Sequence, residues 1–264
     1  MVKVDKYKQD IQDTSYTMSK DENTPTSGET APSDAQPSGF EWWRRSLQYK
    51  TGLGLTPELK EQYETDYKDV IQKKQCTDCY HNRDWLITYS PTVRFLMQQI
   101  KKLERRRDFS NPANANLIKF DESKIICDFC PDWKSGGFHP EVGILLCQNR
   151  FKNKWHLEDT LSHELVHWYD NLKWQVDWTN LRQHACSEIR ASSLSGECRF
   201  WQELSRRGLG FEISRGHQNC VKRRAVLSVM GNPKCEDRAH AERVVDEVWE
   251  SCFNDTRPFE EIYR

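Results

Sequence analysis

The segment WHLEDTLSHELVHWYD, residues 155–170, decides the fold, because it combines a helical pattern with two histidines, His163 and His167, four positions apart. Its large apolar residues recur at helical spacing, which predicts one helix through the whole segment. Side chains four positions apart on a helix project from the same face, about 6 Å from each other. Both imidazoles can therefore bind one metal ion, with Glu164 beside them.

The pattern His-Glu-x-x-His is typical of zinc peptidases, in which zinc has three protein ligands and an open position for water. Glu164 can reach that water as a general base, while the ion polarises the peptide carbonyl. Such a pattern arises by chance with a probability of roughly 2% in a chain with eight histidines. The alternative is an ordinary amphipathic helix whose histidines form hydrogen bonds with their neighbours.

The third metal ligand must come from elsewhere, and we expect Glu188, on the helix that follows. A glutamate would complete the His₂Glu set known from zinc peptidases. His184 lies one turn earlier on the same face and is the rival ligand, while Asp170 and Asp177 are further alternatives. We expect Asp170, one turn beyond His167, to orient a ligand without binding the ion.

Two short β-rich runs, at residues 124–127 and 142–147, lie before this helix, with several glycines and prolines between them. The turn residues are Pro131, Gly136, Gly137 and Pro140. Zinc peptidases keep an edge strand that pairs with the substrate backbone at the place of the second run. We therefore expect the substrate edge strand to consist of Val142, Gly143, Ile144, Leu145 and Leu146.

Helical patterns flank this region on both sides. Pro57 occupies the first position of one predicted helix, and Pro91 begins another that carries apolar residues at helical spacing. Helices return from Trp155 to the end, with breaks at 208–210 and 231–233. Helices, a small sheet and helices again predict an α+β fold that is mostly helical.

The first 40 residues are rich in Ser, Thr, Asp, Pro and Gln and have few large apolar side chains. They cannot bury enough surface to offset their ordering entropy, so we expect a disordered tail over 1–40 and a folded domain over 41–264. The tail also lacks the features of a secretory signal or a transit peptide. The aromatic and basic cluster at 40–45 is expected to dock onto the domain, with a membrane surface as the alternative.

The net charge of the chain is close to zero, at −1. No overall positive field favours nucleic acid, and we expect none as a partner. No apolar run approaches the roughly 20 residues that a membrane-spanning helix needs.

The chain has ten cysteines, an even and high number for which we expect five disulfide bonds formed in an oxidising compartment. The pairs Cys76-x-x-Cys79 and Cys127-x-x-Cys130 could instead hold a structural zinc ion, although 47 residues separate them. Reduced thiols are a third alternative.

Cys186 and Cys198 are not expected to pair with each other. If one helix runs through both, about 1.5 Å per residue places them roughly 18 Å apart. A disulfide needs Cα atoms within about 7 Å.

Four segments extend the pattern: HELVH at 163–167, DWTNLR at 177–182, HACSEIRA at 184–191 and LSGEC at 194–198. Together they resemble a family of mitochondrial intermembrane-space metalloproteases that also serve as assembly factors of the ATP synthase. The resemblance spans about residues 41–264. It implies a zincin-like domain with one catalytic Zn²⁺ ion, disulfides introduced by the intermembrane-space disulfide relay, and peripheral association with the inner membrane.

The same resemblance implies two activities. One is removal of the N-terminal propeptide from the precursor of ATP synthase subunit 6, and the other is chaperoning of that subunit into the membrane sector with the subunit 9 ring. It also implies turnover of small lipid-transfer proteins of the intermembrane space. The alternatives are an assembly chaperone or a disulfide-rich binding module in which proteolysis is dispensable, but a binding module would not need Glu164 as a base.

Overall fold

The computed structural model describes residues 39–107, 118–130, 134–199 and 216–260. It divides into one unit over Met1–Thr56 and a second over Pro57–Arg264. The predicted tail, except its last two residues, lies outside the described residues. In the first unit, helix α2 (Gly39–Thr51) contains the aromatic and basic cluster and exposes Trp43 and Leu47.

The second unit begins with two helices whose start positions confirm the predictions from proline. Helix α3 (Pro57–Tyr89) is followed after one residue by α4 (Pro91–Glu104). The Ser90 hydroxyl accepts a hydrogen bond from the Val93 amide and caps α4. The apolar face of α4 is buried, as its helical spacing predicted.

A three-stranded sheet follows, preceded by the 3₁₀ turn η2 (Glu122–Lys124). Its strands are β1 (Ile125–Asp128), β2 (Gly136–His139) and β3 (Gly143–Cys147), in the order β1-β3-β2. β1 runs parallel and β2 antiparallel to β3.

The expectation that the run from Val142 to Leu146 is the substrate edge strand is therefore wrong. β3 lies in the middle of the sheet, and both of its backbone edges are paired. Its almost continuous burial is what a central strand requires. Among the described residues, β2 is the strand at the edge of the sheet next to β3, and it contacts α5. It was missed because Gly136 and Gly137 indicated a turn.

The predicted metal-binding helix is α5 (Lys154–Trp174). In the described part of the chain after it, the helices are α6 (Leu181–Leu194), α8 (Gly216–Met230) and α9 (Arg238–Phe253). The predicted break at 231–233 separates α8 from α9, whereas the one at 208–210 lies outside the described residues. These elements confirm a mostly helical α+β fold.

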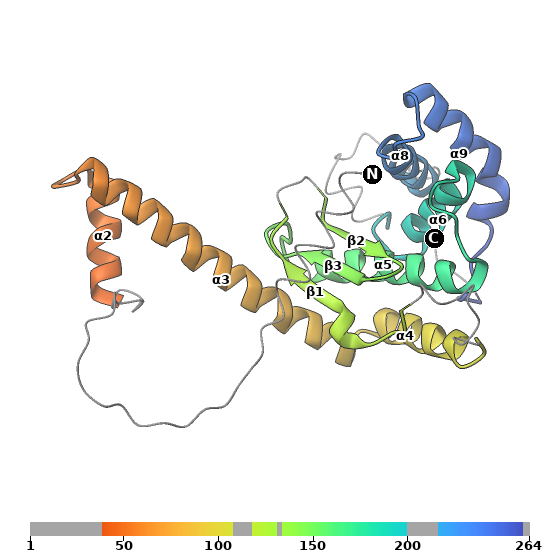
Figure 1. Ribbon diagram of the computed structural model, residues 1–264, viewed down its shortest axis with the longest axis horizontal. Coiled ribbons are helices and arrows are strands. Elements are labelled where there is room, and N and C mark those ends of the chain that lie inside the picture. Colours follow the sequence, from red (N-terminus) through yellow and green to blue (C-terminus); the bar gives the residue numbers. More distant parts are fainter. Residues whose placement is uncertain (1–38, 108–117, 131–133, 200–215, 261–264) are drawn as a thin grey trace. The chain divides into compact units, whose positions relative to one another are not determined.

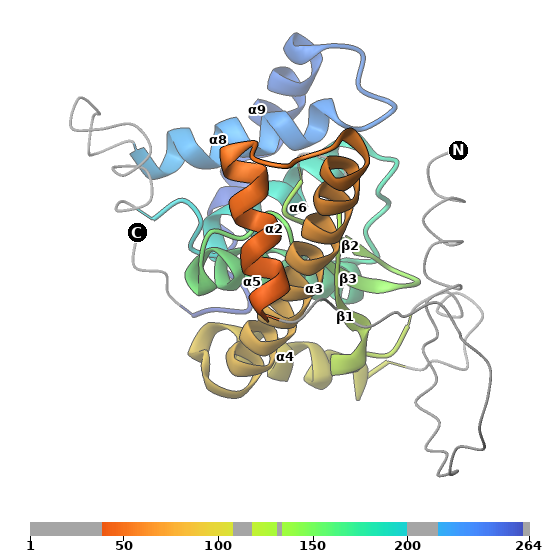
Figure 2. The ribbon, with the colours of Figure 1, turned by 90° about the vertical axis from the view of Figure 1, so that its left-hand side faces the viewer.

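Helix α5 is the centre of the second unit, because it contacts α4, α6, β2 and β3 (Figures 1 and 2). One apolar core lies between α4, the sheet and α5, and a second lies between α6, α8 and α9. Contacts with α4 and the sheet and with α6 explain why fifteen residues of α5 are buried. No helix in the described ranges has the length and apolar character needed to cross a bilayer.

Four disulfide bonds connect these elements, and not the five that the cysteine count predicted. They are Cys79–Cys127, Cys130–Cys147, Cys186–Cys252 and Cys198–Cys220. Cys76 on α3 and Cys235 between α8 and α9 are free thiols, and both are partly buried. The pairing excludes a four-thiolate zinc site and confirms that Cys186 and Cys198 are not joined.

We predict two free thiols in the unreduced, denatured protein and ten after reduction. Because the ten cysteines all lie in the described ranges, alkylation followed by peptide mapping should label Cys76 and Cys235 alone. Absence of any free thiol would show a fifth disulfide and contradict this pairing.

Candidate metal centre

The predicted ligands converge on one point between α5 and α6. The Nε2 atoms of His163 and His167 lie 3.0 Å apart. One carboxylate oxygen of Glu188 lies 3.5 Å from Nε2 of His163, and the other lies 3.3 Å from Nε2 of His167. All three side chains are buried, and their ligand atoms lie within 4.8 Å of one another.

The connection between the two helices brings Glu188 to the histidines. Gln175 ends α5 in the left-handed region at φ 52°. Asn180 caps α6, and its side chain accepts hydrogen bonds from the amides two and three residues later. Between them, the Trp178 indole donates to Asn171 on α5. Its ring lies 5.4 Å from that of His167 and so covers the ligand. Sequence reasoning gave Trp178 no role.

His163 is oriented by Glu197, a residue whose role the sequence analysis missed. The Nδ1 atom of His163 lies 3.1 Å from one Glu197 oxygen, and Arg224 pairs with the other at 2.5 Å. Burial raises the pKa of Glu197, but His163 and Arg224 outweigh it and lower that pKa to about 2. An ionised carboxylate only accepts hydrogen bonds, so Nδ1 donates and the Nε2 lone pair faces the other ligands.

His167 is oriented through a serine. Its Nδ1 lies 2.8 Å from the Ser187 hydroxyl, which lies 3.1 Å from Asp170. The hydroxyl gives its proton to the carboxylate and accepts from Nδ1, which leaves the Nε2 lone pair of His167 toward the site. Asp170 therefore contacts His167 only through the Ser187 hydroxyl.

The rival ligand His184 lies beside Glu188, with its Nε2 3.5 Å from the carboxylate. Its two ring nitrogens also contact Ser228 at 3.2 Å and Asn232 at 3.0 Å. Asp177 is exposed and accepts hydrogen bonds from Thr179, outside the cluster.

Three acceptor groups that face one another inside a protein are stabilised by a positive charge between them, either a metal ion or a bound proton. Burial lowers the pKa of His163, but Glu197 and Glu188 outweigh it and raise that pKa well above its usual value. Burial likewise raises the pKa of Glu188, but His167 and His163 hold it well below its usual value. The residues fit a metal ion, and the two nitrogens and one carboxylate match the donor set of catalytic sites.

Glu164, the predicted base, lies on α5 in the wall of a cavity of about 410 Å³, which the predicted metal ligands also line. The cavity is lined by β2, α5, α6 and α8. Burial raises the pKa of Glu164, and the nearby histidines oppose this.

Strand β2 approaches α5 closely at Gly136. A Cβ atom there would meet Thr160 Cγ2 at 2.9 Å, the Leu145 carbonyl at 3.0 Å and Glu164 Oε1 at 3.3 Å. A Cβ on the next residue, Gly137, would meet nothing within 4 Å. Only the first glycine is therefore required by packing.

We predict that Gly136→Ala destabilises the protein by about 1–3 kcal/mol, because the strand must move away from α5. The same shift should displace the Glu164 carboxylate. Gly137→Ala is the matched control and should leave the free energy of unfolding unchanged in denaturant titrations. Equal stability of the two variants would contradict this packing.

The sequence itself assigns the chain to a class. Residues 77–260 match the model of the Peptidase M76 family, so the chain belongs to this family and is a metallopeptidase. It is similar to the mitochondrial inner membrane protease ATP23 of Kluyveromyces lactis, with 71% identity over 88% of this chain and 93% of the relative. The protein of the same name from Saccharomyces cerevisiae S288c is 66% identical over 86% and 97%. That of Debaryomyces hansenii is 55% identical over 92% and 96%. No solved structure matches the chain.

Proposed function

We propose that the protein is a zinc-dependent endopeptidase in which His163, His167 and Glu188 bind one ion and Glu164 is the general base. The observation that carries this proposal is the buried convergence of the three ligand groups beside Glu164 in one cavity. When bound, zinc polarises the scissile carbonyl and makes water a better nucleophile.

Glu164 takes a proton from the attacking water and returns it to the amine that leaves. A base is most effective when its pKa is near the working pH, and burial moves the pKa of Glu164 in that direction. The low-dielectric wall of the cavity thus prepares the residue for both proton transfers.

An extended substrate can pair with β2, whose outer edge has no strand partner among the described residues. Gly136 and Gly137 belong to this strand and line the cavity beside Glu164. Backbone hydrogen bonds with a strand edge hold a peptide independently of its side chains. We therefore propose β2, in place of β3, as the strand that orients the substrate.

We predict that Glu164→Gln keeps the fold and the zinc but lowers peptide cleavage by about 10²–10⁴-fold, because glutamine cannot accept the proton. Turnover and zinc content of the purified variant are the measurements. Glu242→Gln, at an exposed position of α9, is the control. Substantial cleavage by the Glu164 variant would remove that residue as the base.

We also predict different effects for the two candidate third ligands. His184→Ala should weaken zinc binding by about 10–100-fold, as loss of a residue that supports a ligand does. Glu188→Gln should weaken it further and stop cleavage, because it removes a ligand and its charge. Chelator competition measures both affinities. A zinc-loaded, active Glu188→Gln beside a metal-free His184→Ala would make His184 the ligand.

We further propose that the protein acts in the mitochondrial intermembrane space, associated peripherally with the inner membrane. The names of the relatives support the membrane, and the four disulfides support an oxidising compartment and formation by the disulfide relay. The proposed substrate is the precursor of ATP synthase subunit 6, whose N-terminal propeptide would be removed.

A separate chaperone activity in assembly of the membrane sector is the second candidate, and it rests on the sequence resemblance. If the two activities are separate, cells that carry Glu164→Gln should assemble the ATP synthase while they accumulate unprocessed subunit 6. Loss of assembly in those cells would tie both activities to proteolysis.

A further inference from the structure

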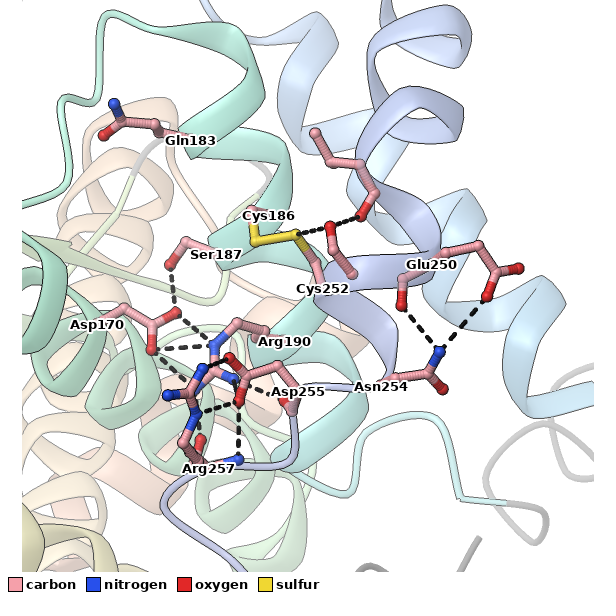
Figure 3. The surroundings of a disulfide bond; sticks show 12 residues. Asp170, Gln183, Cys186, Ser187, Arg190, Glu250, Cys252, Asn254, Asp255 and Arg257 are labelled. Atoms are coloured by element: carbon pink, nitrogen blue, oxygen red, sulfur yellow. Dashed lines mark hydrogen bonds and ion pairs between the residues drawn. A yellow bond between two sulfur atoms is a disulfide. The ribbon is translucent and has the colours of Figure 1, made fainter.

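Behind the metal site, Arg190 of α6 lies at the centre of a buried ionic cluster (Figure 3). Its side chain is 2% exposed, and its Nε and Nη2 contact the Asp170 carboxylate at 3.1–3.2 Å. Its Nη1 contacts the side chain of Asp255 at 2.7 Å and the carbonyl of the same residue at 2.6 Å. Nη2 also donates to the Arg257 carbonyl. All three guanidinium nitrogens are thus engaged.

The cluster joins the metal site to the C-terminal strap, which we define as residues 254–259 after α9. Two contacts fix the ends of this strap. The disulfide Cys186–Cys252 attaches the end of α9 to α6, one residue before Ser187. At the other end, the ring of Phe259 packs 4.8 Å from that of Phe95 on α4.

The two carboxylates that Arg190 contacts have different roles. Asp255 belongs to the strap, whereas Asp170 receives the Ser187 hydroxyl proton and thereby supports His167. Arg190 also stacks 4.6 Å from the Trp174 ring, which restricts its guanidinium plane. A planar donor fork held against an aromatic ring can fix the position of Asp170 more narrowly than a point charge could.

We propose that Arg190 is a positioning residue of the metal site, which connects the C-terminal strap to His167 through Asp170 and Ser187. This inference rests on the proposed zinc site. The strap thereby sets the position of a ligand that it does not touch. A buried ion pair can also serve the fold alone, and pairs of that kind often add little net stability. A positioning role for Arg190 would change zinc binding at His167, whereas a purely structural ion pair would change only the stability of the fold.

The experiment measures zinc affinity of the full, oxidised chain by chelator competition in Arg190→Lys, Arg190→Gln and Ser187→Ala. Arg190→Lys keeps a buried cation for Asp170 but cannot contact both of its oxygens and the strap. We expect it to weaken zinc binding about 10-fold, and Arg190→Gln up to about 100-fold. Arg182→Gln is the matched control, because Arg182 is another arginine of α6 that pairs with a carboxylate of a neighbouring element, Glu247 of α9, but is 69% exposed. It should leave the affinity within about twofold.

A double-mutant cycle separates positioning from simple loss of stability. If Arg190 acts through Ser187, Arg190→Lys in the Ser187→Ala background should cost little further affinity. In the metal-free protein, NMR of the His167 ring should show a changed proton position in both single variants. Should Arg190→Gln fail to fold, the cycle with lysine carries the test.

Unchanged zinc affinity and an unchanged His167 spectrum in Arg190→Lys, with lower thermal stability, would overturn the proposal and leave a purely structural ion pair. Additive losses in the cycle would also overturn it. Absence of zinc binding by the unsubstituted protein would instead refute the proposed function, so the two failures are distinguishable.

Discussion

The structure depends on one electrostatic constraint: two imidazole lone pairs and a carboxylate face one another in a buried place. Such groups repel unless a cation lies between them, and they rotate away unless other bonds fix them. Here each predicted ligand also contacts a second side chain that orients it. Glu197 holds His163, Ser187 holds His167, and His184 lies beside Glu188. These side chains are therefore arranged so that they could hold a positive ion.

The two apolar cores and the disulfides make this arrangement possible. α6 contributes residues to both cores and is fixed to α9 by Cys186–Cys252. Cys198–Cys220 ties the segment after Glu197 to α8, which carries Arg224. Disulfides restrict the unfolded chain most when the loops they close are long, and here the cysteines of one pair are 66 residues apart in sequence. Residues far from the ligands thus take part in their alignment.

Much of the fold could be predicted because its signals are local. A few neighbouring residues are enough to show helical spacing, a proline at a helix start or the apolar run of β3. The spacing of the two histidines likewise places both imidazoles on one face of the helix. Glu188 followed from its place on the next helix, where the structure brings it to the histidines.

The rest depends on tertiary contacts that a sequence does not display. Gly136 and Gly137 form the edge strand because β3 supplies the hydrogen bonds, although alone they indicate a turn. Nothing in the local sequence marks Ser187 or Glu197 as a site residue. Each contacts a histidine of α5 only because α6 and the residues after it pack against α5. The count of cysteines could not reveal that Cys76 and Cys235 remain free, since it contains no distances.

The most direct test of the central claim is X-ray absorption at the zinc edge on the purified, oxidised protein. The account predicts one zinc per chain, with nitrogen and oxygen neighbours at about 2.0–2.2 Å, two of them imidazoles. Sulfur neighbours at about 2.3 Å would mean that cysteine thiolates bind the ion, and would contradict a site built from His163, His167 and Glu188.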